Sequence, residues 1–127
     1  MATGGLSFRK DQRLKDKAAF DRVFRKARRS SDKCFTVLAR RSDDAPARLG
    51  LAIAKKHCRK ASARNRIKRV VRESFRHHQA QLHGIDFVVM NRPAAAMATN
   101  QELASSLAKH WQNSVRATRD RQEGRQR

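Results

Sequence analysis

The segment from residue 47 to residue 92 places a helical pattern between two strand patterns, and this order constrains the fold more than any other feature. Apolar side chains alternate over residues 47–55 (ARLGLAIAK) and fill residues 85–92 (IDFVVMNR), which Pro93 ends. Over residues 62–82 they recur at three- and four-residue spacing, as in a helix. Strand, helix and strand form a βαβ unit, so the two strands are expected to be parallel neighbours.

The chain on either side of this unit adds two helices and one strand. Residues 16–27 carry one apolar helical face, and residues 33–41 (KCFTVLARR) read as a strand before a turn at SDDAP. Thr99 and Glu102 have the spacing of a capping box, and the apolar stripe that follows predicts a last helix with Trp111 in the core. The order α-β-β-α-β-α predicts an α+β fold, a single-domain sandwich of helices on a small mixed sheet.

The 127 residues show one candidate core and no internal repeat. We expect a flexible basic N-terminus over residues 1–12, one domain over residues 13–115, and a basic tail over residues 116–127 that frays. No stretch approaches the roughly 20 apolar residues of a spanning helix, and no secretory signal opens the chain, so a cytoplasmic location is expected. Cys34 and Cys58 have no CxxC pairing and are expected to be buried thiols.

The charge balance points to a polyanionic partner. Lys and Arg number 31 against 11 Asp and Glu, a formal net charge of +20. Such a charge opposes the compact state by self-repulsion unless a polyanion neutralises it. Nucleic acid is the expected partner, and a membrane surface is the main competitor. Ten of the 22 residues in KKHCRKASARNRIKRVVRESFR (55–76) are Lys or Arg, and Glu73 is the only acid there.

The start of the helix predicted over residues 62–82 breaks a local rule. A helix N-terminus favours acids, yet Arg59 and Lys60 precede this one, and Arg64 and Arg66 follow. Exposed N–H groups and cations together predict a phosphate site. On the side away from the apolar stripe the helix carries Asn65, Arg69, Arg72 and Arg76, flanked by Arg66 and Lys68. Arg64 falls beside the apolar stripe, where it could reach across the sheet.

Two alternatives to an RNA-binding face are weaker. A face charged only for solubility would mix signs, whereas this one carries almost only positive charge. A basic helix can also enter the DNA major groove, but strands flank this helix and a helix-turn-helix arrangement is missing, so no DNA partner is expected.

The same residues carry a resemblance to a known family. The run ARNRIKR (63–69), preceded by a Leu-Gly-Leu strand that ends in Lys-Lys, is similar to the signature of the bacterial ribonuclease P protein component. RLKDKAAFDRVF (13–24) resembles the first helix of that family, and GIDFVVMNRP (84–93) resembles its last strand. The resemblance covers about residues 8–115.

The resemblance implies a left-handed βαβ crossover and an accessory role. In the family a catalytic RNA removes the 5′ leader of precursor tRNA with a divalent metal, Mg²⁺ being expected, and the protein supplies no catalytic residue. The implied RNA-subunit-binding residues are Arg59, Lys60, Arg64, Asn65, Arg66, Lys68, Arg69, Arg72 and Arg76. The implied leader cleft, between the first helix and the sheet, contains Phe20, Phe24, Phe35, Val37, Lys55 and Lys56.

Two features of that cleft stay open. Phe20 and Phe24 are spaced as core residues of a helix, but aromatic faces also stack unpaired bases. Val37 stands where some family members carry an aromatic residue, and the chain contains no Tyr. Phe35, on the same face, could replace it.

Catalysis by protein side chains is not expected. The five His residues show no metal-binding spacing, and Asp43, Asp44 and Asp86 form no two-metal pair, so the His residues are expected on the surface or in packing. No cofactor-binding motif is present, and metal sites on the protein are not predicted. The second hypothesis for function is a ribosomal or general RNA-binding protein without a role in tRNA 5′ processing.

Overall fold

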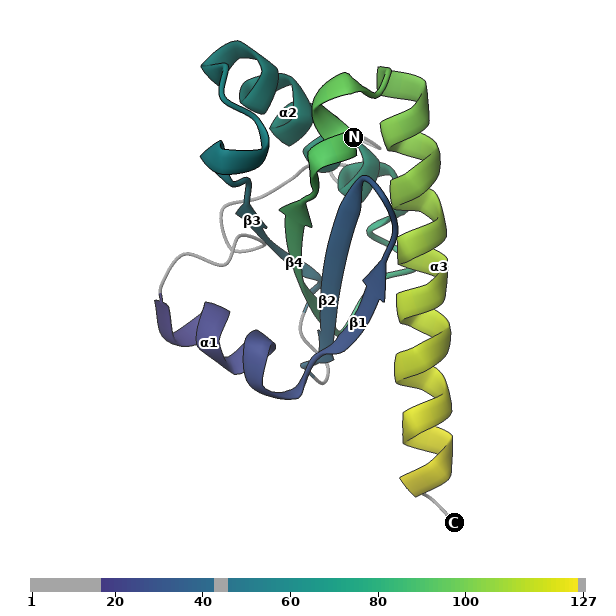
Figure 1. Ribbon diagram of the computed structural model, residues 1–127. Coiled ribbons are helices and arrows are strands. Elements are labelled where there is room, and N and C mark those ends of the chain that lie inside the picture. Colours follow the sequence, from purple (N-terminus) through teal and green to yellow (C-terminus); the bar gives the residue numbers. More distant parts are fainter. Residues whose placement is uncertain (1–16, 43–45, 126–127) are drawn as a thin grey trace, which may run out of the picture.

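The computed structural model describes residues 17–42 and 46–125, apart from the side chains of residues 19, 20, 22, 26 and 119–125. The predicted flexible N-terminus, the middle of the SDDAP turn and the Phe20 side chain lie outside this part. Three strands follow the first helix, and the fourth strand lies between the two long helices (Figure 1). They are α1 (Lys17–Lys26), β1 (Arg28–Ser31), β2 (Phe35–Arg41), β3 (Arg48–Ala52), the 3-10 turn η3 (Lys55–His57), α2 (Ala61–His78), β4 (Ile85–Asn91), the 3-10 turn η4 (Pro93–Met97) and α3 (Asn100–Arg125).

The four strands form one mixed sheet in the order β1-β2-β4-β3. β2 pairs antiparallel with both β1 and β4, whereas β3 and β4 are parallel, with Leu49 opposite Phe87 and Leu51 opposite Val89. The parallel pairing confirms the βαβ unit predicted from residues 47–92. The left-handed sense of its crossover stays a prediction from the resemblance.

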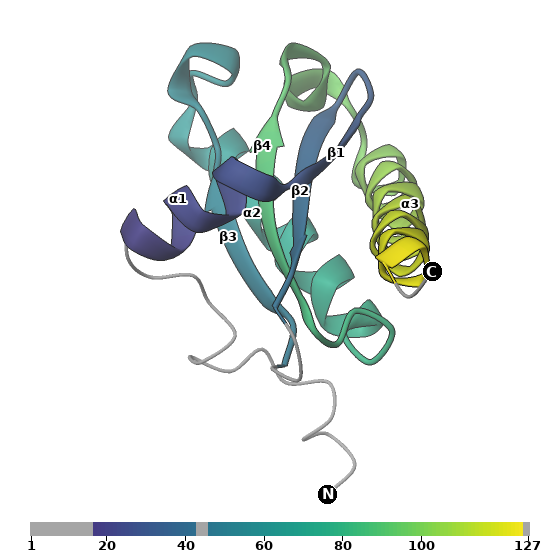
Figure 2. The same ribbon diagram turned by 90° about the horizontal axis from the view of Figure 1, so that it is seen from below.

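Helices cover both faces of the sheet (Figures 1 and 2). On one face, the main core packs Phe35 and Val37 of β2 against side chains of α2 and α3. On the other face, Val23 of α1 packs against Leu38 and Val88. Successive residues of a strand point to opposite faces, so β2 contributes to both layers. This explains why its first five residues are all buried.

Three aromatic rings hold the main layer together. Trp111 of α3 lies edge-on to Phe87 of β4 and to Phe75 of α2, with ring centroids 5.0 Å and 6.0 Å apart. Its indole Nε1–H donates to Ser74 Oγ at 2.8 Å, so the buried indole N–H and the buried hydroxyl each have a hydrogen-bond partner. The prediction that Trp111 is a core residue is confirmed, and this hydrogen bond accounts for a polar side chain, Ser74, on the buried side of α2.

β1 was not predicted from the sequence. Its residues, RRSS, include no apolar side chain, so neither alternation nor β propensity marks them. The strand forms at the edge because its backbone pairs with β2 and because Ser30 Oγ lies 2.7 Å from His110 Nδ1 of α3. His110 is therefore a packing residue, as one of the two readings for the His residues had it.

The predicted end of each long helix was wrong. α2 ends at His78, and the chain turns over residues 79–84 to Gly84, whose φ of 81° suits a residue without a Cβ. α3 was expected to fray from residue 116, but it is helical through Arg125. Thr118, about two turns after Trp111, is still buried, and most residues beyond it are good helix formers. The capping box at its start is confirmed, with Thr99 and Glu102 exchanging hydrogen bonds of 2.8 Å and 3.1 Å.

Candidate RNA-binding surface

The start of α2 exposes backbone donors without an acid to neutralise them. Lys60, the N-cap residue, is extended and forms no side-chain cap, and the first turn contains no Asp or Glu. The first helical hydrogen bond runs from the Arg64 N–H to the Lys60 carbonyl at 3.0 Å, so the N–H groups before Arg64 have no partner inside the helix. Such a helix end attracts anions through its donors and its dipole.

Arg64 turns back onto the loop before the helix. Its Nη1 donates to the carbonyl oxygens of Cys58 and Arg59, at 3.0 Å and 2.7 Å. The sequence placed Arg64 where it could reach across the sheet, and the structure differs because these two carbonyls are nearer acceptors. The guanidinium thus fixes the loop that carries Arg59 and Lys60, both exposed.

Arg66 reaches in the opposite direction, toward α3. Its Nη1 donates to Asn100 Oδ1 at 2.7 Å, and its Nη2 lies 3.5 Å from the Ala96 carbonyl oxygen of η4. The two arginines that flank Asn65 therefore brace two different neighbouring segments. Asn65 itself is exposed between them.

The rest of the basic helix presents cations of unequal availability. Arg69 and Arg72 are exposed, and Lys68 is half-buried. Arg76 donates to Glu73 Oε1 at 2.7 Å, and this hydrogen bond is the main cause that lowers the pKa of Glu73. The end of the helix is thus partly neutralised, and the positive charge is strongest from its start to Arg72.

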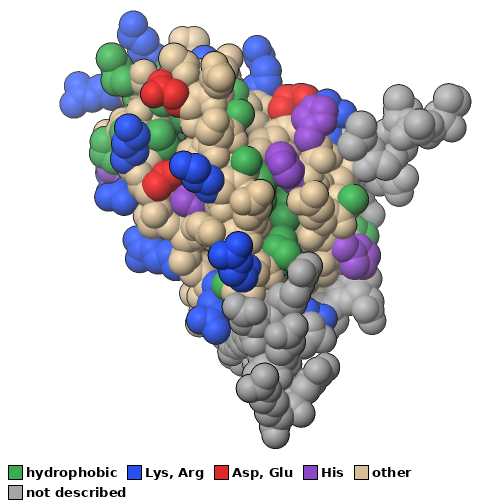
Figure 3. Space-filling model, turned by 90° about the vertical axis from the view of Figure 1, so that its right-hand side faces the viewer, with side chains coloured by type: hydrophobic (Ala, Val, Ile, Leu, Met, Phe, Trp, Pro, Cys, Tyr) green, Lys and Arg blue, Asp and Glu red, His purple; other side chains and the backbone are tan. Residues whose placement is uncertain are grey.

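The positive charge is not uniform over the molecule. Figure 3 views the side of α3, where Lys and Arg lie mostly on one half of the face and His and uncharged atoms fill much of the other.

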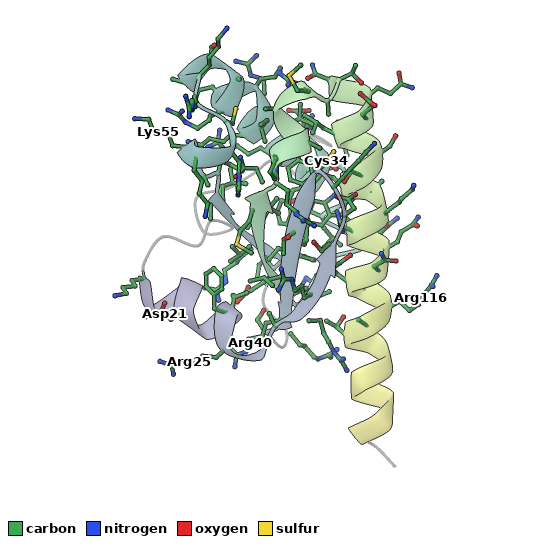
Figure 4. All side chains as sticks on the ribbon, in the orientation of Figure 1. Asp21, Arg25, Cys34, Arg40, Lys55 and Arg116 are labelled. Carbon is green, nitrogen blue, oxygen red and sulfur yellow. The ribbon has the colours of Figure 1, made fainter. Side chains whose placement is uncertain are left out.

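Figure 4 places Lys55 at one end of the molecule and both Arg25 and Arg40 at the other. At the latter end, Arg48 forms a two-point ion pair with buried Asp86, through Nε at 2.9 Å and Nη2 at 2.6 Å.

Two residues assigned to the leader cleft lie on the wrong face. Phe35 and Val37 are both 0% exposed and pack in the main core against α2 and α3. The expected cleft lies on the face that α1 covers, and there β2 contributes Leu38 instead. The assignment failed because alternation separates the two faces of a strand without stating which helix covers each.

The other cleft residues differ in what the structure supports. Phe24 of α1 is 48% exposed, so its ring is open to a ligand. Lys55 and Lys56 are exposed, but they lie on η3 and not at the end of a strand, because β3 already ends at Ala52. Beside Leu38, the sequence also missed Met90 and Ala52, which pack partly buried around the α1 layer. The available sequence signal was the alternation of the small residues Gly50, Ala52 and Ala54 along residues 47–55, which leaves one face of that segment nearly bare.

A second polar cluster joins the β1–β2 hairpin to α3. Asp32 Oδ1 accepts the N–H groups of Cys34 and Phe35 at 2.9 Å, and Oδ2 accepts Ser106 Oγ at 2.5 Å. Burial raises the pKa of Asp32, but these hydrogen bonds outweigh burial and bring the pKa to about 2. His110 Nε2 lies 3.3 Å from Oδ2. This cluster stabilises the hairpin.

Neither a metal cluster nor a membrane helix is found in the described part of the chain. Among residues 17–42 and 46–125, no three His, Cys, Asp or Glu side chains gather to hold a metal ion. None of the described helices is long and apolar enough to cross a membrane. Cys34 and Cys58 are free and buried, which confirms the prediction for both thiols.

Comparison with known proteins agrees with this arrangement. The profile of the family described as Ribonuclease P matches residues 8–115. The ribonuclease P protein component of Methylococcus capsulatus is 51% identical over 107 residues, which are 84% of this chain and 84% of that protein. That of Pseudoalteromonas atlantica is 44% identical over 108 residues, covering 85% of this chain and 90% of the relative.

Solved structures give the same result for the fold. The RNase P protein of Staphylococcus aureus superposes with a TM-score of 0.71 at 28% identity, covering 84% of this chain and 94% of that one. The RNase P protein of Thermotoga maritima gives a TM-score of 0.71 at 27% identity, with 80% and 96% covered. The α+β fold, the basic helix and these similarities together establish that the chain belongs to the ribonuclease P protein family.

Proposed function

We propose that this chain is the protein subunit of ribonuclease P and that it assists a catalytic RNA in removing the 5′ leader of precursor tRNA. The observation that carries the proposal is the start of α2. There a helix N-terminus without acids lies among exposed Arg59 and Lys60, in a chain of the ribonuclease P protein family. We place the protein in the cytoplasm.

The RNA subunit binds along α2 from its start to Arg72. Phosphates lie against the helix N-terminus and against Arg59, Lys60, Asn65, Arg69 and Arg72, all exposed. Arg64 and Arg66 keep this surface in place through their contacts with neighbouring segments, and each retains donors for a phosphate. Lys68 and Arg76 contribute less, because Lys68 is half-buried and Arg76 already pairs with Glu73.

The leader of the precursor binds on the side of the sheet that carries α1. Phe24 offers an exposed ring, and unpaired bases stack on aromatic faces without sequence preference. Leu38 and Met90 give this face an apolar floor, and Lys55 and Lys56 supply positive charge for the leader backbone. Because the product has lost its leader, this surface favours precursor over mature tRNA.

The RNA subunit carries out the cleavage, with Mg²⁺ as its metal. We assign neither the acid nor the base of this step to the side chains that the structure describes in residues 17–42 and 46–125. Asp86 is buried against Arg48, and the Asp32 carboxylate is occupied by hydrogen bonds of the hairpin. Cations placed beside the RNA reduce phosphate repulsion, so less Mg²⁺ is needed for the folded, active RNA.

A reconstitution assay tests this proposal. Purified, nuclease-treated protein should leave precursor tRNA intact, and addition of a bacterial ribonuclease P RNA should give cleavage at the mature 5′ end at low Mg²⁺. Cleavage by the protein alone would refute the accessory role. A ribosomal or general RNA-binding protein would bind precursor equally well with and without its leader, and it would not lower the Mg²⁺ requirement.

A further inference from the structure

Met97 is the most exposed large hydrophobic side chain among the described residues. It is 89% exposed, compared with 48% for Phe24. Single exposed apolar residues are common on protein surfaces and by themselves indicate nothing. The position of Met97 distinguishes it, because it is the last residue of η4, three residues before α3 begins at Asn100.

Arg66 ties the segment that carries Met97 to the basic helix. Its guanidinium contacts the carbonyl oxygen of Ala96, one residue before Met97, and the side chain of Asn100, three residues after it. Met97 therefore lies beside the RNA-binding start of α2, between two points held by one of its arginines. We call residues 96–100 the η4–α3 junction.

The η4–α3 junction is an ordered support for an exposed side chain. The Ala98 N–H donates to the Ala95 carbonyl, and Ala95 itself is fully buried in the main core. Thr99 and Glu102 satisfy each other's backbone N–H groups at the start of α3. Glu102 is the acid nearest to the junction in sequence, and its carboxylate is engaged by Thr99. Met97 is thus presented without the entropy cost of ordering a loose loop.

We propose that the η4–α3 junction extends the RNA-binding surface of α2, and that the Met97 side chain packs against an unpaired base of the RNA subunit. The inference rests on the proposed function. A folded RNA offers phosphates to the arginines, and its unpaired bases offer flat apolar faces that hydrogen-bonding residues alone do not cover. A thioether is unbranched, flexible and polarisable, so it suits contact with an aromatic ring of variable orientation.

Site-specific crosslinking tests the contact directly. A photoreactive diazirine analogue of methionine is placed at position 97 in the full-length chain, with Met90→Leu and with the initiator methionine removed. After assembly with ribonuclease P RNA, irradiation should give one main crosslink, to an unpaired nucleotide of that RNA. The matched control carries the analogue at position 90 with Met97→Leu. Because Met90 lies on the α1 side of the sheet, it should not give this crosslink.

Binding measurements supply a second readout. Met97→Ser should weaken binding to the RNA subunit about 2- to 10-fold, the range that a sulfur–aromatic contact contributes. The slope of log K against log[salt] should stay unchanged, since no charge is removed. Met97→Leu should retain most of the affinity. The side chain is almost fully exposed, so neither substitution should alter the melting temperature.

The results separate this inference from the function on which it rests. If the wild-type protein binds ribonuclease P RNA, but position 97 gives no crosslink and Met97→Ser binds normally, the inference is refuted and the function stands. A crosslink from position 97 to the precursor instead of the RNA subunit also refutes it. If the wild-type protein fails to bind ribonuclease P RNA, the proposed function fails first.

Discussion

Arg66 Nη1 lies 2.7 Å from Asn100 Oδ1, and this hydrogen bond joins the basic outer side of α2 to the first turn of α3. A guanidinium has five N–H donors in a fixed planar arrangement, so one donor can brace the fold while others meet a phosphate. A side chain that is held before binding also loses less conformational entropy on binding. The arginine therefore braces the fold, and we expect it to bind RNA through its remaining donors.

Separate substitutions of these two residues should distinguish the brace from the charge. Asn100→Ala keeps the cation and should weaken RNA binding less than tenfold, with an unchanged salt slope. Arg66→Ala removes a phosphate contact and should reduce the slope of log K against log[salt] by about 0.7–0.9. Titrations of ribonuclease P RNA at several salt concentrations measure both quantities.

Arg76→Ala is the matched control for Arg66→Ala. Arg76 lies on the same helix but is already paired with Glu73, so its removal should change the slope much less. An equal change of slope for Arg66→Ala and Arg76→Ala would contradict the assignment of the RNA-binding surface to the start of α2.

Phe24→Ala should reduce the preference for precursor over mature tRNA without unfolding the protein. The ring is 48% exposed, so its removal leaves little cavity, whereas base stacking contributes about 1–3 kcal/mol per base. The measurement is the ratio of dissociation constants for precursor tRNA with and without its leader. An unchanged ratio in a folded variant would remove Phe24 from the leader surface.

Phe35→Ala, in contrast to Phe24→Ala, should destabilise the fold. The side chain is fully buried between the sheet and the helices of the main core, and such truncations cost about 3–5 kcal/mol in the free energy of unfolding. Urea unfolding followed by circular dichroism measures this loss. A stable Phe35→Ala variant with a reduced precursor preference would restore Phe35 to the leader surface, against the burial seen here.

Arg48→Met should destabilise the fold strongly. Asp86 is 1% exposed and would remain as a buried carboxylate without its two-point partner, a loss of about 3–5 kcal/mol when one partner of a buried pair is removed. The double variant Arg48→Met/Asp86→Leu should recover much of this loss. If the single and double variants unfold at the same urea concentration, the ion pair does not account for the effect.

Asp32 should make the folded protein less stable in acid. Its pKa of about 2 is below the ordinary 3.8, so its contribution is complete above pH 3.8 and is lost as the pH falls toward 2. The shift corresponds to roughly 2 kcal/mol, and to about half of that after allowance for solvent, because the side chain is 36% exposed. Asp32→Asn should flatten the dependence of unfolding free energy on pH over this interval. An identical acid response in the variant would exclude Asp32 as its source.

Regular periodicity allowed most elements to be predicted from the sequence. α1, β2, β3, α2, β4 and the start of α3 carry apolar side chains at strand or helix spacing, and each was found. β1 was missed, since an edge strand of Arg and Ser is stabilised by its neighbours and not by its own side chains. The end of α3 was misplaced, because a helix can continue without an apolar stripe when its residues favour helix.

The amino-acid sequence by itself determined the charge of the protein, its helix and strand periods and its family, because these depend on residue type and spacing alone. Only the tertiary structure decided which face of β2 meets α1. Both faces of this strand are apolar and covered by helices, so Phe35 and Leu38 are equivalent until the helices are placed. The structure also decided where Arg64 and Arg66 point, since their acceptors are carbonyl and amide oxygens brought close by folding.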